Sequence, residues 1–272
     1  MSRQPDNKPG DRHETACRAC GAAIEAPQTT NATSSLCDRC REQDEIRTAF
    51  DSRLTALVAL ERTDPDQALA ILDELRTTYG DRDHDGWLDR SISEHRAHIF
   101  AQNGLHREAL EELRMLEPKL TKGTPDYTHN KAAIALALDG LGKHDAALEE
   151  LELGLATSDQ LPAEVVLNLF SAYARIVRSQ GWTVPSTHRD LLMRAVAELG
   201  IPVTHELIHS SVTEAILAVI ATRRQASKRF SILRQQARGQ PTEVAESLIR
   251  AYIDTEPVGF YRDMARRWLD EI

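Results

Sequence analysis

Aromatic residues are scarce in this chain, since Phe, Trp and Tyr together make up only 5% of its 272 residues. A β-sheet core draws heavily on aromatic and β-branched side chains, whereas closely packed helices can be filled by Leu and Ala. Leu and Ala supply most of the apolar side chains here. The composition therefore favours an all-α core.

Long apolar runs and an excess of positive charge are also missing. No run approaches the roughly 18 apolar residues that a membrane-spanning helix needs, and residues 1–15 are polar and charged, unlike a secretory signal. The net charge of −9 makes the chain as a whole repel nucleic acids and anionic membrane surfaces. We therefore expect a soluble cytoplasmic protein with a disordered leader over 1–15, no membrane contact and a protein rather than a nucleic acid as its partner. The oligomeric state stays open.

Cysteine is confined to four positions within 24 residues, which form two Cys-x-x-Cys pairs with 16 residues between them. Two such pairs can present four thiolates tetrahedrally to one zinc ion. The layout resembles a zinc ribbon or treble-clef finger, in which the second pair stands at a helix start. We predict a zinc module over 16–45 that holds one structural Zn²⁺, with a redox-active dithiol as the alternative; the predicted ligands are Cys17, Cys20, Cys37 and Cys40.

Helical periodicity is abundant, and one phrase occurs twice. Gly104-Leu-His-Arg-Glu-Ala-Leu-Glu-Glu-Leu113 recurs 38 positions later as Gly142-Lys-His-Asp-Ala-Ala-Leu-Glu-Glu-Leu151. A unit of helix, glycine turn and second helix cannot bury its apolar face alone, so it must stack on copies of itself. The small Ala residues at close helix contacts and the turn glycines resemble a tetratricopeptide repeat over 46–160. The spacing of 38 to 41 residues implies longer helices or looser turns than that family's 34.

This resemblance implies a right-handed α-solenoid of five to six helix pairs, with a concave face lined by the first helix of each pair. Such a face holds a peptide or another protein. Residues 46–160 would form the repeats, and residues 161–272 would form divergent repeats and C-terminal capping helices. By the resemblance, the groove would be lined by Glu94, His98, Gln102, His129 and Asp139.

Apolar spacing and Pro or Gly breaks place the individual helices. The segment Asp81-x-Asp83-x-Asp85-Gly86 is similar to the start of a calcium-binding loop, but Ile92 stands where the closing Glu is needed, so we interpret it as a polar turn. The predicted helices span residues 41–62, 66–79, 87–102, 105–116, 127–141, 144–156, 163–180, 186–199, 204–224, 227–238, 241–254 and 257–272.

A candidate catalytic motif is His205-Glu206-Leu207-Ile208-His209, which matches the His-Glu-x-x-His signature of zinc peptidases. Two histidines four apart on a helix share one face and can bind Zn²⁺ while the glutamate polarises a water. No third ligand follows at a recognisable spacing, and Leu207 and Ile208 already suit a packed repeat helix. We therefore interpret the segment as structural and keep a zinc metallopeptidase as the alternative.

A basic segment over 223–238 forms the second candidate site. Between Glu214 and Glu243 there is no acidic residue, yet six basic residues occur there: Arg223, Arg224, Lys228, Arg229, Arg234 and Arg238. Such a face could pair with acids elsewhere in the repeats, contact nucleic acid, or bind an acidic protein partner. Aromatic residues are few in the segment, which argues against nucleic acid.

The sequence thus predicts an all-α protein in which a small zinc module precedes a helical solenoid. We expect a non-catalytic adaptor or scaffold for a protein or peptide partner. A zinc peptidase that uses residues 205–209 and a regulator that contacts nucleic acid through residues 223–238 are the alternatives.

Overall fold

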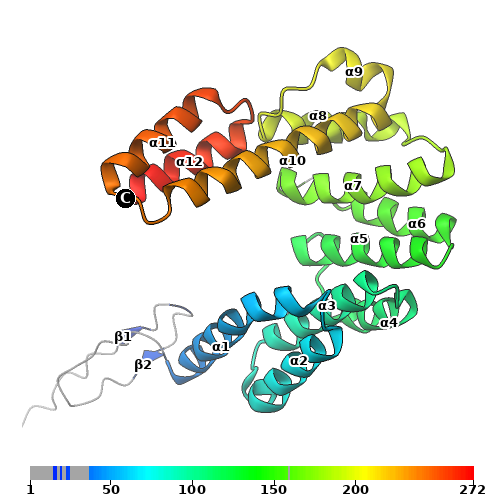
Figure 1. The fold of residues 1–272 in the computed structure, drawn as a ribbon. Helices are drawn as coiled ribbons and strands as arrows, with labels where there is room; N and C mark the ends of the chain where they lie inside the picture. Colours follow the sequence, from blue (N-terminus) through cyan, green and yellow to red (C-terminus); the bar gives the residue numbers. More distant parts are fainter. Residues whose placement is uncertain (1–14, 17–18, 20–22, 25–36, 159) are drawn as a thin grey trace, which may run out of the picture. The chain divides into compact units, whose positions relative to one another are not determined.

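The computed structural model describes residues 15–16, 19, 23–24, 37–158 and 160–272 (Figure 1). Within these residues lie twelve α-helices, three short 3₁₀ helices and two strands of two residues each. The strands β1 (Thr15–Ala16) and β2 (Ala23–Ile24) pair antiparallel, with Thr15 opposite Ile24. The all-α class expected from the Leu- and Ala-rich composition is confirmed for this part of the chain. Two compact units divide the chain, Met1–Asn103 and Gly104–Ile272.

The helices of the first unit are α1 (Asp38–Leu60), α2 (Pro65–Tyr79) and α3 (Trp87–Gln102). Each of the three packs against the other two. The break between α1 and α2 follows from the residues at the start of α2. The carboxylate of Asp64 accepts a hydrogen bond from the backbone N–H of Gln67 at 3.0 Å. Pro65 occupies the first helical turn, where its missing N–H costs no helical bond.

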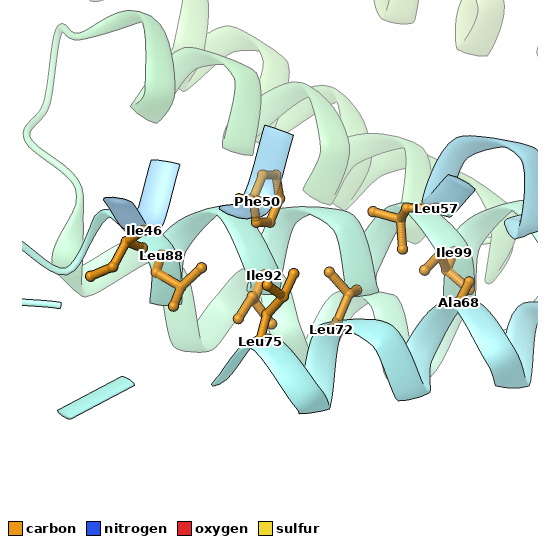
Figure 2. Packing of buried hydrophobic residues seen from close by; sticks show 9 residues of the cluster. All are labelled: Ile46, Phe50, Leu57, Ala68, Leu72, Leu75, Leu88, Ile92 and Ile99. Atoms are coloured by element: carbon orange, nitrogen blue, oxygen red, sulfur yellow. The ribbon is translucent and has the colours of Figure 1, made fainter. Parts of the chain in front are cut away.

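Nine buried apolar side chains form the core between these three helices (Figure 2). They recur at helical spacing on each helix, so each helix presents one apolar face to the other two. Burying a side chain of this size stabilises the fold by about 1.5–3 kcal/mol. The core residues are Ile46, Phe50, Leu57, Ala68, Leu72, Leu75, Leu88, Ile92 and Ile99.

The acidic segment after α2 forms the short 3₁₀ helix η1 (Gly80–Arg82) and then a turn into α3. Two of its carboxylates accept backbone N–H groups at the start of α3: Asp83 from Asp89 and Asp85 from Trp87, both at 3.0 Å. The first N–H groups of a helix have no partner within the helix, so these bonds stabilise its end. The interpretation of this segment as a turn is confirmed.

The second unit begins with five consecutive helices, and each packs against the next along the chain. The 3₁₀ helix η2 (Glu117–Lys119) follows α4, and η3 (Ser186–His188) precedes α8. The five helices are α4 (His106–Leu116), α5 (Pro125–Gly140), α6 (His144–Leu155), α7 (Ala163–Gln180) and α8 (Arg189–Glu198).

The remaining helices are α9 (His205–Ser210), α10 (Val212–Ala237), α11 (Thr242–Thr255) and α12 (Gly259–Glu271). Helix α10 packs against α7, and α11 and α12 pack against each other and against α10. Because α5 also packs against α7, the helix α7 has α5 and α10 as neighbours besides α6 and α8. Eleven of its 18 residues are buried accordingly.

The duplicated phrase adopts the same local structure in both copies. Gly104 and Gly142 both have left-handed backbone conformations, with φ of 75° and 73°, which glycine adopts without the steric cost of a Cβ atom. Each glycine lies two residues before a helix whose first-turn Ala is fully buried, Ala109 in α4 and Ala147 in α6. The predicted helix and turn boundaries around both copies are confirmed to within a few residues.

One predicted pair of helices is wrong in its boundary. The sequence suggested helices over 204–224 and 227–238, but the break lies at Ser211, and α10 runs unbroken through Gln225 and Ala226. Ser211 has an extended backbone, and its hydroxyl accepts the N–H of Glu214 at 3.2 Å, which caps α10. The pattern Ser-x-x-Glu at 211–214 is a capping-box signal that marks this start.

Among the residues that the structure describes, no helix has both the length and the apolar character to cross a bilayer. Even α10, with 26 residues, carries five basic side chains. The assignment of 46–160 and 161–272 to separate repeat regions rests on sequence similarity and stays a prediction.

Candidate functional site

A groove in the second unit is formed by α5, α7 and α10, of which α7 packs against both of the others. Its part between α5, α7 and the first half of α10 has a volume of about 850 Å³. A second hollow of about 560 Å³ lies along α7 and α10. The two share Asn168, Ser171, Ile220 and Arg224 in their linings, so they form one continuous groove. We call it the α5–α7–α10 groove.

Helical spacing explains why these side chains gather on one surface. On α7 the lining residues Asn168, Ser171, Arg175 and Arg178 follow one another at intervals of three or four. Residues at this spacing lie on the same face of a helix. The opposite face of α7 is buried and includes Phe170, which is not exposed at all. Burial of that apolar face therefore leaves the polar face of α7 toward the groove.

The surface of the groove combines apolar and polar groups. Half-buried aliphatic side chains, Leu136 on α5 with Leu217 and Ile220 on α10, line its larger part together with several alanines. These side chains are buried too little to belong to the core and too much to be fully solvated. A partner with apolar side chains could therefore bury further apolar area against them.

A chain of hydrogen bonds links the three helices across the groove. Arg223 Nη1 on α10 donates to Asn168 Oδ1 on α7 at 3.1 Å. The amide nitrogen of Asn168 lies 3.1 Å from Nε2 of His129 on α5, and an amide N–H can only donate, so this ring nitrogen accepts. The bonds fix the positions of these side chains before any partner binds.

Four further cations line the groove: Arg175 and Arg178 on α7, and Arg224 and Lys228 on α10. All four side chains are exposed. Within the described part of the chain, none of the four forms an ion pair or a side-chain hydrogen bond, and the lining contains no Asp or Glu. The groove is consequently a region of positive potential on a chain whose net charge is −9.

The five residues expected to line a partner groove are distributed over both units. His129 lines the α5–α7–α10 groove. Asp139, also on α5, instead pairs with Nδ1 of His144 at 2.8 Å, beside the turn at Gly142. It does not contribute to the groove lining. His144, which belongs to the duplicated phrase, therefore makes a contact at the turn of its own repeat.

The other three expected residues lie on α3 in the first unit. Nε2 of His98 is 3.5 Å from the carboxylate of Glu61, and Gln102 accepts a hydrogen bond from Nε of Arg62 at 2.8 Å. His98 and Gln102 also contact each other. Glu94 is one turn before His98 on the same helix. Their predicted role in partner binding stays a prediction.

Sequence reasoning missed Arg175 and Arg178, although a signal for them exists. Both follow Asn168 at helical spacing on the polar side of a helix whose other side is strongly apolar. Asn168 itself lies 39 residues after His129, close to the repeat offset of 38. Extending the repeat into α7 would have placed these residues on the same surface as His129.

The basic segment 223–238 does not form one surface. Arg229 makes two hydrogen bonds of 2.8 Å to Glu256, whose side chain is completely buried. Burial by itself would raise the pKa of Glu256, but the bonds from Arg229 and from the N–H of Val258 outweigh burial and lower it. Arg234 and Arg238 line a separate hollow of about 890 Å³ beside Trp268 of α12.

The motif His205-Glu206-Leu207-Ile208-His209 occupies α9, which is only six residues long. Both histidines and Glu206 are exposed, whereas Ile208 is buried and anchors the helix. In the described ranges 37–158 and 160–272, no three His, Cys, Asp or Glu side chains are grouped so that they could hold a metal ion. The motif therefore has no third ligand within these ranges.

Of the predicted zinc ligands, Cys37 and Cys40 lie in the described part of the chain, and Cys17 and Cys20 lie outside it. Cys37 is the N-cap residue of α1, and Cys40 lies in the first turn of that helix. Both are half-buried. The expectation that the second pair stands at a helix start is confirmed, and zinc binding stays a prediction.

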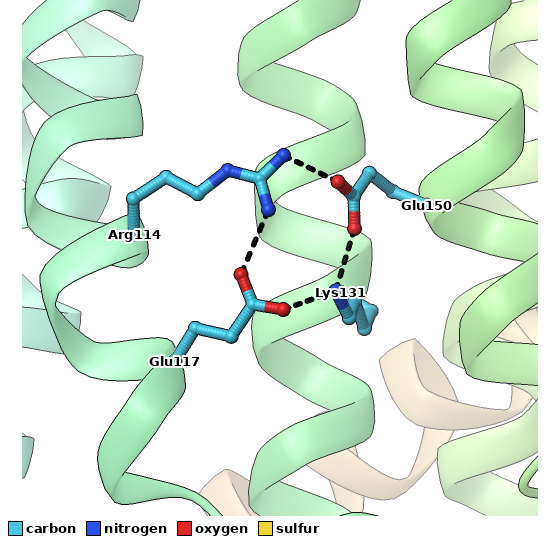
Figure 3. A network of polar contacts seen from close by, with 4 residues as sticks. All are labelled: Arg114, Glu117, Lys131 and Glu150. Atoms are coloured by element: carbon cyan, nitrogen blue, oxygen red, sulfur yellow. Dashed lines mark hydrogen bonds and ion pairs between the residues drawn. The ribbon is translucent and has the colours of Figure 1, made fainter.

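A ring of four charged side chains in the second unit is structural (Figure 3). Lys131 on α5 donates to Glu150 of α6 at 2.7 Å and to Glu117 of η2, while Arg114 of α4 donates to Glu117 at 2.8 Å and to Glu150. Burial would raise the pKa of Glu117, but the bonds from Lys131 and Arg114 outweigh it and lower this pKa. Because every charge has two partners, the ring ties α4, α5 and α6 together and leaves no free group for a ligand.

No protein-family model, curated protein or solved structure matches this chain.

Proposed function

We propose that this chain is a non-catalytic adaptor that holds a protein or peptide partner in the α5–α7–α10 groove. The observation that carries the proposal is the groove itself, which combines aliphatic surface with exposed cations that have no partner among the described residues. Its side chains offer hydrogen bonds, charge and apolar contact, which are the means of recognition. Among the lining residues described, His129 is the one general-base candidate, and its Nε2 is already engaged by Asn168.

The helices around the groove suit a repeat architecture. We propose that the helix pairs stack as a right-handed solenoid resembling tetratricopeptide repeats, with the first helix of each pair on the binding face. The matching turns at Gly104 and Gly142 and the buried alanines that follow them support this assignment. In such a stack, α5, α7 and α10 would supply the concave surface, and α6 and α8 would lie on the outer side.

A structural zinc ion is part of the same proposal. Four cysteines in two Cys-x-x-Cys pairs would bind one Zn²⁺, with no position left open for a reacting water. The placement of Cys37 and Cys40 at the start of α1 suits that role, because a helix N-terminus favours thiolates. The ion would hold the N-terminal module against α1 without taking part in chemistry.

The groove can be blocked by one substitution. Ala133 of α5 is half-buried in the groove lining, and Ala133→Trp would fill the space beside it. Ala197→Trp is the matched control, since Ala197 is exposed on α8 and does not line the groove. Partners captured from cells of the source organism with the tagged chain would be purified, and their affinity for each variant measured by isothermal titration calorimetry.

We expect a partner to bind the wild type and Ala197→Trp with the same affinity. It should bind Ala133→Trp at least about tenfold more weakly, because a rigid indole fills the space in the groove that the partner's side chains would occupy. A partner that binds all three proteins with one affinity would place recognition elsewhere and overturn the proposal. Far-UV circular dichroism of the three proteins checks that the helices are retained.

A further inference from the structure

The chemistry of the groove identifies the class of its ligand, an inference that rests on the proposed function. Five basic side chains from two helices face the groove: Arg175, Arg178, Arg223, Arg224 and Lys228. Only Arg223 has a partner among the described residues, and this partner is the neutral amide of Asn168. No carboxylate in the described part of the chain therefore neutralises the positive charge of the groove.

The contrast with Arg229, on the same helix, is informative. That side chain lies five residues after Arg224 and is bound by a buried carboxylate through two hydrogen bonds of 2.8 Å. The same helix thus holds one arginine that stabilises the fold and others that do not. Cations that repel one another on one surface contribute nothing to folding, whereas an anionic ligand would make their proximity favourable.

The shape of these groups suits carboxylates. A guanidinium presents several N–H donors in a planar fork that matches both oxygens of a carboxylate. Arg175 and Arg178 lie one turn apart on α7, as do Arg224 and Lys228 on α10. Carboxylates spaced along an extended or helical peptide could therefore meet cations from both sides of the groove.

The apolar surface distinguishes a peptide from a nucleic acid. Single-stranded nucleic acids bind proteins largely by stacking bases on aromatic rings. Among the described residues, no Phe, Trp or Tyr lines the larger part of the groove, and its smaller part has only Tyr261, which is buried. Aliphatic side chains such as Leu136, Leu217 and Ile220 instead suit the aliphatic side chains of a peptide.

We propose that the α5–α7–α10 groove binds an acidic segment of a protein partner, in which Asp or Glu residues alternate with aliphatic ones. The carboxylates would bind Arg175, Arg178, Arg224 and Lys228, and the aliphatic residues would cover Leu217 and Ile220. Complementary charge would speed association and favour acidic segments over other peptides, with affinity that falls as salt rises.

The test begins with a phage library of random 12-residue peptides, selected on the full-length protein. Selected peptides would be synthesised with a fluorescein label, and their dissociation constants measured by fluorescence anisotropy at 150 and 500 mM NaCl. A labelled 12-nucleotide uridine RNA serves as the nucleic-acid probe. Four proteins would be compared: the wild type, Arg175→Glu/Arg178→Glu, Ala133→Trp, and the matched control Arg107→Glu/Lys143→Glu.

The two residues of the control, Arg107 and Lys143, are exposed in the same unit and do not line the groove. The control therefore changes net charge by the same amount as Arg175→Glu/Arg178→Glu. All four residues of the two double variants are exposed, so both variants should keep the helical circular dichroism spectrum of the wild type. Any difference in binding between them then reports position and not net charge.

We expect the selected peptides to be rich in Asp, Glu and aliphatic residues. Reversal of Arg175 and Arg178 should weaken their binding at least about tenfold, and the control less than about twofold. Raising the salt to 500 mM should weaken wild-type binding by a similar factor, because exposed ion pairs are screened.

Other outcomes separate the two proposals. Peptides that lack acids, or that tolerate Arg175→Glu/Arg178→Glu but are lost with Ala133→Trp, would overturn the acidic ligand and leave the groove as the binding site. Peptides that bind all four proteins equally would overturn the adaptor groove itself. Groove-dependent binding of the RNA in place of peptides would overturn both, since the ligand would be a nucleic acid.

Discussion

Replacing Lys131 by Met tests the charged ring that joins α4, α5 and α6 in the second unit (Figure 3). Methionine has a similar length and no charge, so the change removes both hydrogen bonds to Glu150 and Glu117 while keeping most of the packing. The side chains of Lys131 and Glu150 are only 3% and 9% exposed. The carboxylates of Glu117 and Glu150 would therefore lose the hydrogen bonds of Lys131 at a buried site where water has little access to replace them.

The expected loss follows from this burial. Removing one partner of a buried ion pair costs about 3–5 kcal/mol, because the remaining charge is left uncompensated. Arg114 still binds both Glu117 and Glu150 in the variant, so we expect the lower end, about 3 kcal/mol. In urea, with an m-value of about 2 kcal/mol per molar, this loss lowers the unfolding midpoint by about 1.5 M.

The assay is equilibrium unfolding in urea, followed by circular dichroism, with two companions for Lys131→Met. Lys143→Met removes an exposed lysine of the same unit and should change stability by less than about 0.5 kcal/mol. The double variant Lys131→Met/Glu150→Met removes one charge of each sign and should recover most of the loss. If Lys131→Met were no less stable than Lys143→Met, or if the double variant were the least stable, the reasoning about the ring would be wrong.

Three further outcomes are expected. The pKa of Glu117 is lower in the folded than in the unfolded protein. Its contribution to stability is therefore fully present above about pH 4.3, the ordinary Glu pKa, and is lost as pH falls through the folded pKa. Urea midpoints measured from pH 7 to pH 3 should drop more steeply for wild type than for Glu117→Gln. Gly154→Ala places a Cβ 2.9 Å from Leu169 Cδ2 and should destabilise the protein by about 1–3 kcal/mol in thermal unfolding. A stabilised variant would contradict this close contact, because Gly→Ala stabilises a helix where the added methyl group has free space. Elemental analysis should give one zinc per chain for wild type and for His205→Ala/His209→Ala, and less for Cys37→Ser; a second zinc lost with the histidines would contradict the single structural ion.

The basic residues of α10 have different surroundings on different faces of the helix. Arg229 is held by Glu256, a residue at the end of α11. This bond anchors α10 against the C-terminal helices. Arg224 and Lys228, on a different face, stay available in the groove. A single helix can therefore carry a stabilising ion pair on one face and exposed cations on another, because its faces meet different surroundings.

Local signals in the sequence were sufficient to find most of the secondary structure. Apolar periodicity placed the helices, and α3 and α7 begin and end at the expected residues. The duplicated phrase correctly marked the turns at Gly104 and Gly142. The error at Ser211 came from overlooking a capping signal and not from a long-range effect. Such features depend on residues within one or two turns, and the sequence displays these directly.

The residues that line the α5–α7–α10 groove could be predicted only in part by the same reasoning. The expected groove residues included His129, which lines the groove, and Asp139, which pairs with His144 instead. Both lie on α5 and are polar, and their spacing of ten residues does not by itself say which of them faces a neighbouring helix. That assignment depends on how α5 packs against α4, α6 and α7.

The sequence alone determined the helical class, the positions of the turns, the spacing of the cysteines and the concentration of positive charge in 223–238. The tertiary structure alone decided which of those cations are neutralised. Arg224 and Arg229 are the same residue type and lie on the same helix, but only Arg229 binds a buried carboxylate, that of Glu256, which lies 27 residues further along the chain. Helical periodicity fixes the face on which a side chain lies, and the packing of distant helices determines what covers that face.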